Sequence, residues 1–273
     1  MDTWRLLITP PAHGAWNMAL DETILEAVGH GTSLPTLRLY AWEPACISLG
    51  YAQPFTDVDL PRLRERGWEV VRRPTGGRAV LHTDELTYSI IAPHDESRVT
   101  GTVLESYHRL AEALVKALNL LNMQVTINDS SAAPQPANNN PVCFEVPSTY
   151  EIIVEGKKLI GSAQARRKDG VLQHGSIPLT GDLTRIIQVL TFPDEDSRTH
   201  AAERLLLRAT TVETVLERKV TWNETAEAII TAFGSVLALQ LQPGYLTAEE
   251  KTRTEELVRV KYGHSSWTEK SRL

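Results

Sequence analysis

The chain has 273 residues, 42% of them hydrophobic and 23% charged, which are the proportions of an ordinary globular protein. Its 34 acidic and 28 basic residues give a net charge of −6, so composition offers no basic surface for nucleic acid. No apolar run approaches the roughly 20 residues that cross a bilayer, the first residues do not resemble a signal peptide, and two cysteines make no disulfide framework. We therefore expect a single cytoplasmic domain over residues 1–273 that binds neither membrane nor nucleic acid.

Hydrophobic periodicity and turn residues predict the following elements in the first half of the chain. In chain order they are a strand at Trp4–Ile8, a helix at Ala15–Val28, strands at Thr36–Trp42 and Ala45–Leu49, a short helix at Asp59–Arg66, strands at Trp68–Arg72 and Leu86–Ile91, and a long helix at Thr102–Leu121.

The second half is expected to begin with a strand at Met123–Ile127 and an irregular segment, Asn128–Pro141, which is rich in Pro, Asn and Ser. The expected elements that follow are strands at Tyr150–Val154, Lys158–Arg166 and Val171–Leu179, and then helices at Asp182–Leu190, Thr211–Glu217, Thr221–Leu239 and Thr247–Tyr262. This order predicts an α/β (α+β) fold, with a mixed β-sheet flanked by helices and a helical C-terminal part from about residue 180.

A cysteine and a lysine are the strongest candidates for chemistry. Cys143 closes the polar, proline-broken segment, and Lys158 lies in the run Gly156-Lys-Lys-Leu-Ile-Gly-Ser-Ala163. A thiol accepts an acyl group from a thioester, and a nearby ammonium can stabilise the thiolate or polarise the carbonyl. The alternatives are a cysteine that is simply a small hydrophobe, as we interpret Cys46, and a strand lysine that points into solvent.

A glycine-rich segment, Arg72-Arg-Pro-Thr-Gly-Gly-Arg-Ala-Val-Leu-His82, follows one expected strand and precedes another. Paired glycines allow the backbone to approach a ligand, although a hairpin flanked by solvated arginines is an equally good interpretation. His82 and His174 could each be ordinary hydrogen-bonded residues. No Walker A run occurs, and no His or Cys spacing indicates a metal site.

Taken together, these segments resemble the biotin/lipoate protein ligase superfamily. The resemblance rests on Asn17–Glu22, Pro44–Gly50 with Gln53, Arg72–His82, Gly156–Ala163 and His174–Ser176, which occur in order between about residues 4 and 179. Within that superfamily, Val142-Cys143-Phe144 and the Arg78 version of the glycine motif resemble the LipM-type octanoyltransferases. Lipoate ligases commonly have a third glycine at the position of Arg78.

The resemblance implies an apolar tunnel for an eight-carbon acyl chain, with Cys143 as nucleophile and Lys158 as the active-site lysine. It also implies a set of substrate-binding residues: Arg73, Thr75, Gly76, Gly77, Arg78, Ala79, Val80, His82, Gly161, Ser162, Ala163, His174 and Gly175.

The implied reaction moves octanoate from octanoyl-acyl carrier protein to the lysine of a lipoyl domain, such as that of the glycine cleavage H protein. It needs no cofactor and no metal, and we expect a monomer. The base that deprotonates the acceptor lysine is not identified. The alternatives are an ATP-dependent lipoate-protein ligase, an amidotransferase between lipoyl domains, and a non-catalytic acyl-binding protein.

Overall fold

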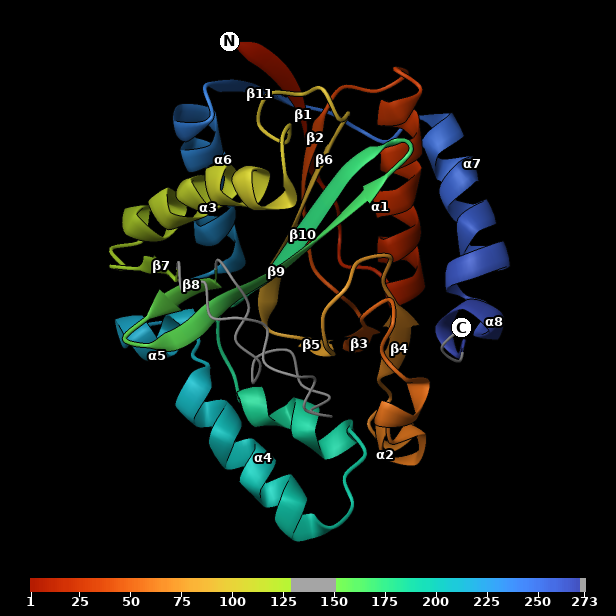
Figure 1. Cartoon of the computed structure of the whole chain (residues 1–273), viewed down its shortest axis with the longest axis vertical. Coiled ribbons are helices and arrows are strands. Elements are labelled where there is room, and N and C mark those ends of the chain that lie inside the picture. The colour runs from red at the N-terminus through yellow and green to blue at the C-terminus, as the bar shows by residue number, and fades with distance from the viewer. Residues whose placement is uncertain (129–150, 271–273) are drawn as a thin grey trace.

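An eight-stranded mixed sheet forms the centre of the computed structural model, which describes residues 1–128 and 151–270 (Figure 1). In spatial order its strands are β11 (Leu239–Pro243), β1 (Asp2–Ile8), β2 (Thr36–Tyr40), β6 (Glu85–Ala92), β10 (Gly170–Pro178), β9 (Lys157–Arg167), β8 (Glu151–Val154) and β7 (Thr126–Asn128). β1 is parallel to both β11 and β2, and every other neighbouring pair is antiparallel.

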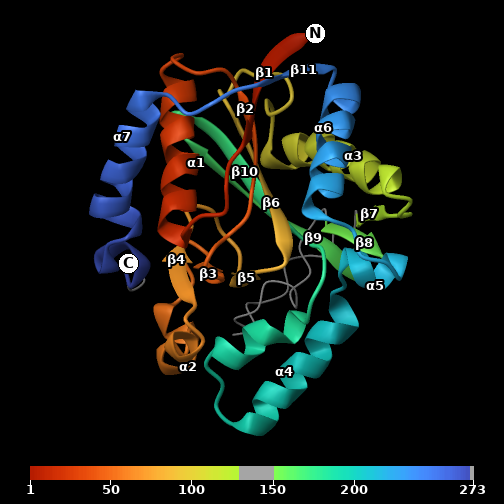
Figure 2. The same ribbon diagram turned by 180° about the vertical axis from the view of Figure 1, so that it is seen from behind.

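Helices cover both faces of this sheet, as Figures 1 and 2 show from opposite sides. α1 (Gly14–Gly29) lies on one face with α7 (Ala248–Leu257) outside it, and α3 (Val103–Leu120) and α6 (Trp222–Val236) pack on the other. Because successive strand residues point to opposite faces, Leu6 packs in the cluster beneath α3 and α6, whereas Leu7 packs beneath α1. The predicted mixed sheet flanked by helices is confirmed.

A smaller three-stranded sheet lies at one end of the large one. Its order is β4 (Glu69–Arg72), β3 (Cys46–Leu49) and β5 (Val80–His82). Beyond it lie η1 (Phe55–Asp57), α2 (Leu60–Glu65), η3 (Leu183–Val189) and α4 (Glu195–Arg208), which share one hydrophobic cluster with β3 and β5 (Figure 1).

The C-terminal part differs from the sequence prediction in four places. α4 was not predicted, because only Ala201 and Leu205 of it are buried and its apolar periodicity is correspondingly weak. The helix expected over Thr221–Leu239 ends at Val236, Ala238 adopts a left-handed φ of 53°, and the chain continues as β11 beside β1.

The predicted helix at Asp182–Leu190 is instead the 3₁₀ segment η3, and the one at Thr247–Tyr262 changes from α7 into a π-helical turn, η4 (Val258–Tyr262). The remaining short helices are α5 (Val212–Leu216) and α8 (Ser265–Thr268).

Two sequence predictions lie beyond the described residues. Cys143 and nearly all of Asn128–Pro141 fall between residues 129 and 150, outside the part of the chain that the structure describes. Within residues 1–128 and 151–270, no helix is both long and apolar enough to span a bilayer.

Candidate functional site

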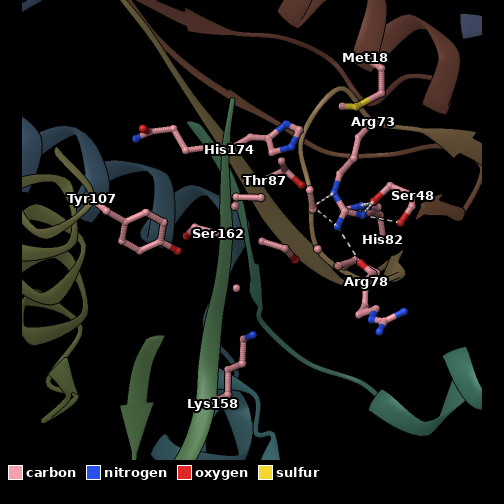
Figure 3. A pocket seen from close by; sticks show the side chains of 18 of the residues that line it. Met18, Ser48, Arg73, Arg78, His82, Thr87, Tyr107, Lys158, Ser162 and His174 are labelled. Atoms are coloured by element: carbon pink, nitrogen blue, oxygen red, sulfur yellow. Dashed lines mark hydrogen bonds between the residues drawn. The ribbon is translucent and has the colours of Figure 1, made fainter. Parts of the chain in front are cut away.

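A cavity of about 520 Å³ lies between the large sheet, the glycine-rich segment and the N-terminal turns of α3 (Figure 3). Its volume is in the range of pockets that hold small organic ligands. Its wall is largely apolar or aromatic where Met18, Tyr40, Trp42, Val80, Leu104 and Tyr107 line it. Polar atoms come mainly from β9, β10 and the segment between β4 and β5.

Most of the residues proposed from sequence meet at this cavity. The lining includes Arg73, Gly76, Gly77, Arg78, Val80, His82, Lys158, Gly161, Ser162, Ala163, His174 and Gly175. Two others do not line it. Thr75, whose hydroxyl lies 2.6 Å from His174 Nε2, instead lines a neighbouring hollow of about 390 Å³. Ala79 is fully buried in the core beside β3.

Lys158 does not point into solvent as a strand lysine usually does. Its side chain is only 5% exposed, and its Nζ donates to Glu151 Oε1 at 2.6 Å. The register between β8 and β9 shifts beside it, since Ile153 pairs with Lys158 but Ile152 pairs with Ile160. Such a bulge re-aims a strand side chain, and here the ammonium faces the cavity (Figure 3).

The glycine-rich segment is a tight, internally bonded loop, so the interpretation of Arg73 as a solvated arginine is wrong. The Arg73 guanidinium donates to the carbonyl oxygens of Ser48, Gly76 and Arg78 at 2.7–2.8 Å. Gly77 has a left-handed φ of 94°, and a Cβ on Gly50 would lie 1.9 Å from Gly77 O. Only glycine fits this close approach of two backbones.

His174 stands at the end of a buried polar chain. Its Nδ1 lies 3.4 Å from Asp21 Oδ2, and the opposite carboxylate oxygen accepts from Arg38 at 2.7 Å. Burial lowers the pKa of the His174 imidazole, and the neighbouring Asp21 only partly offsets this. Burial also opposes the charge on Asp21, but Arg38, His174 and Ser89 together hold the pKa of its carboxyl below its usual value. The chain therefore favours a neutral imidazole facing an ionised carboxylate.

His82 belongs to a second polar chain on the other side of the glycine-rich loop. Its ring stacks on Trp42 with centroids 4.0 Å apart, and its two nitrogens contact the Ser48 hydroxyl and the Glu85 carboxylate. Neither Ser48 nor Glu85 was singled out from sequence. The sequence did carry a signal, because Glu85, Thr87 and Ser89 alternate along β6 and therefore share one face. The structure shows that all three side chains are buried.

Across residues 1–128 and 151–270, no group of three or more His, Cys, Asp or Glu side chains could hold a metal ion. The arrangement can enclose an apolar chain, place a buried ammonium at its wall, and present neutral imidazole and hydroxyl groups to it.

Comparisons with known proteins agree with the family resemblance found in the sequence. Residues 13–234 match the family model of the lipoyl protein ligase A/B catalytic domain. The sequence is 43% identical over 267 residues to an octanoyltransferase LipM from Moorella thermoacetica, covering 97% of each chain, and 39% identical to another from Brevibacillus brevis, covering 98% of this chain and 99% of the relative.

Among solved structures, the fold matches a bipartite lipoate protein ligase of Thermoplasma acidophilum, described with its E2 lipoyl domain, with a TM-score of 0.82 at 26% identity. That match covers 98% of this chain and 97% of the other. A lipoate-protein ligase A bound with ATP matches with a TM-score of 0.78 at 25% identity, covering 98% and 99% of the two chains.

Proposed function

The chain belongs to the lipoyl protein ligase A/B catalytic domain family and, within it, to the LipM octanoyltransferases, and from this membership we propose that it transfers octanoate to lipoyl-domain proteins. The donor in this proposal is octanoyl-acyl carrier protein, and the acceptor is the lysine of a lipoyl domain such as the glycine cleavage H protein. The group passes through a thioester on Cys143.

The buried Lys158 ammonium on the wall of a largely apolar cavity is the strongest structural support. An octanoyl chain placed in this cavity leaves water, which stabilises the complex by about 0.8 kcal/mol for each buried CH₂. A cation beside the chain's carbonyl end would stabilise the oxyanion that develops as a thiolate attacks. Glu151 holds the ammonium in place through the 2.6 Å contact.

The two transfers also balance energetically without ATP. In the first, the Cys143 thiolate attacks the donor thioester, a new C–S bond forms, and the carrier thiolate leaves. In the second, the acceptor amine attacks the enzyme thioester, a C–N bond forms, and the Cys143 sulfur leaves. Exchange between thioesters is close to neutral, and conversion of a thioester into an amide runs downhill.

Intact-mass spectrometry with purified components tests the proposal. Wild type incubated with octanoyl-acyl carrier protein should gain one octanoyl group and then pass it to the lipoyl domain, with or without magnesium-ATP. Cys143→Ala should remain unmodified, and Cys46→Ser, which changes the buried cysteine of β3, should still be acylated. An adduct on Cys143→Ala would disprove the assigned nucleophile.

Two related activities are separate outcomes of the same assay. ATP-dependent loading of free lipoate with pyrophosphate release, and none from the carrier thioester, would make the protein a ligase. Transfer from an octanoylated lipoyl domain, and none from the carrier protein, would make it an amidotransferase.

A further inference from the structure

Ser48, His82 and Glu85 form a continuous hydrogen-bonded line at the wall of the cavity. Ser48 Oγ lies 2.7 Å from His82 Nε2, and His82 Nδ1 lies 2.6 Å from Glu85 Oε1. All three side chains are buried, and both Ser48 and His82 line the cavity (Figure 3). The order of hydroxyl, imidazole and carboxylate is that of the serine hydrolase triad, in which the imidazole moves a proton.

Two groups that can only donate are compatible with hydrogens that run from Ser48 to His82 and from His82 to Glu85. Arg73 Nη1 donates to Ser48 Oγ at 3.1 Å, which leaves the Ser48 hydroxyl able to donate to His82 Nε2. In that arrangement His82 Nδ1 donates to Glu85. Trp42 Nε1 likewise donates to Thr87 Oγ1 at 2.8 Å, which directs the Thr87 hydrogen to Glu85. Glu85 accepts from Thr87, and in this arrangement His82 Nε2 accepts from the Ser48 hydroxyl.

The other titratable groups of the wall are less suited to this task. Lys158 Nζ donates to Glu151 and does not accept there. His174 points Nε2 at Thr75, whose hydroxyl does not line the cavity, and burial lowers the pKa of this imidazole. The His82 ring, by contrast, contacts the Ser48 hydroxyl, and both residues line the cavity.

We propose that Ser48 and His82, with Glu85 hydrogen-bonded to His82, take the proton from the acceptor lysine in the second transfer. This rests on the proposed function, in which the acceptor arrives as an ammonium that cannot attack a carbonyl. The ammonium gives a proton to Ser48 Oγ while the Ser48 proton passes to His82 Nε2, and Glu85 stabilises the imidazolium.

The resulting amine then attacks the enzyme thioester. The C–N bond forms, the C–S bond breaks with its electron pair on sulfur, and the second amine proton goes to that sulfur. One ammonium, one thioester and one neutral imidazole thus give one amide, one thiol and one imidazolium, which releases its proton to solvent.

The test separates this step from acylation and from folding. Wild type, His82→Gln and Ser48→Ala are first acylated with octanoyl-acyl carrier protein, and the acyl-enzyme is then offered either a lipoyl domain or hydroxylamine. Hydroxylamine is uncharged at neutral pH and needs no base. Both variants should transfer to the lipoyl-domain lysine about 100-fold or more slowly than wild type, while their reaction with hydroxylamine stays at the wild-type rate.

His200→Gln, an exposed histidine on α4, is the matched control and should behave as wild type with both acceptors. Equal slowing with lysine and hydroxylamine would show a structural defect and overturn the proposal, as would an unchanged lysine rate. If His82→Gln is not acylated by the donor, the result with Ser48→Ala tests the proposal, because losing one hydroxyl disturbs the buried site less than replacing an imidazole. A wild type that takes up no octanoyl group would instead overturn the proposed function.

Discussion

At the scale of single residues, the most consequential contact is the buried ion pair between Lys158 and Glu151. Each side chain is less than one-tenth exposed, so neither charge is well solvated. Removing one partner of a buried ion pair costs about 3–5 kcal/mol, because the remaining charge stays buried and loses that contact. Stability and chemistry are therefore coupled at Lys158, and a single substitution cannot separate them.

A paired substitution can separate them. Lys158→Met should lower the free energy of unfolding by about 3 kcal/mol and also slow acylation of Cys143, whereas Lys158→Met combined with Glu151→Gln should recover much of the stability. The double variant should still acylate slowly, because the ammonium is absent. Urea unfolding and intact-mass acylation rates measure the two effects. A double variant that acylates at the wild-type rate would rule out an electrostatic role for Lys158.

At the scale of elements, the buried polar chain ties four parts of the fold to the cavity: Asp21 of α1, Arg38 of β2, His174 of β10 and Thr75 of the glycine-rich loop. Each of these residues is fully or almost fully buried, so the chain helps to fix how α1, the sheet and the loop meet.

The buried polar chain that contains Asp21 and His174 predicts a pH dependence of the free energy of unfolding. The folded pKa of His174 lies below its unfolded value of 6.5, so the unfolded chain binds more protons and stability should fall as pH drops below about 6.5. The Asp21 carboxyl, whose pKa is lowered, adds a further loss only below its unfolded value of 3.8. Urea unfolding of His174→Gln between pH 7 and 5 should show a flatter profile than wild type. Parallel profiles would mean that His174 does not titrate as inferred.

The C-terminal helix α8 supports the glycine-rich loop from the side away from the cavity. Trp267 Nε1 donates to Arg72 O at 2.8 Å, and the buried Arg72 guanidinium donates to Gly50 O, Gln53 O and Thr268 O at 2.6–2.8 Å. Through these contacts α8 and β4 hold the Gly50 backbone against Gly77, at the edge of the cavity.

Trp267→Ala should therefore weaken both stability and donor binding. We expect a loss of about 1–3 kcal/mol in the free energy of unfolding and a raised KM for the octanoyl donor. Tyr245→Ala, which removes a 91% exposed aromatic ring, is the control and should change stability by less than about 0.5 kcal/mol. Thermal unfolding and initial rates measure both. An unchanged KM in Trp267→Ala would argue against support of the loop by α8.

At the scale of the whole molecule, the net charge of −6 would oppose docking of the acidic carrier protein of the proposed reaction, so we expect its recognition to use local basic groups. Such contacts are screened as the Debye length falls from about 10 Å at 0.1 M salt to about 3 Å at 1 M. The KM for octanoyl-acyl carrier protein should rise with salt, and that for octanoyl-pantetheine, which lacks the protein, should not. Equal responses would mean that the carrier surface contributes nothing to binding.

The sequence by itself determined the sheet-forming and helix-forming character of most of the chain, because alternation in β1, β6 and β10 and the apolar stripe of α3 are local patterns. The resemblance to the biotin/lipoate protein ligase superfamily implied most of the residues that line the cavity, in the glycine-rich segment, from Gly161 to Ala163, and at His174 and Gly175. The motifs that carry this resemblance are runs of neighbouring residues, so they were visible without any knowledge of packing.

Only the tertiary structure decided which polar residues meet. The Glu85 carboxylate, the Ser48 hydroxyl and the His82 ring come together because β3 pairs with β5 and β6 follows, and nothing local to Ser48 indicates that contact. The same holds for β11, whose partner β1 lies at the other end of the chain. Local propensity is set by neighbours in sequence, whereas hydrogen-bond partners and the burial of charge are set by neighbours in space.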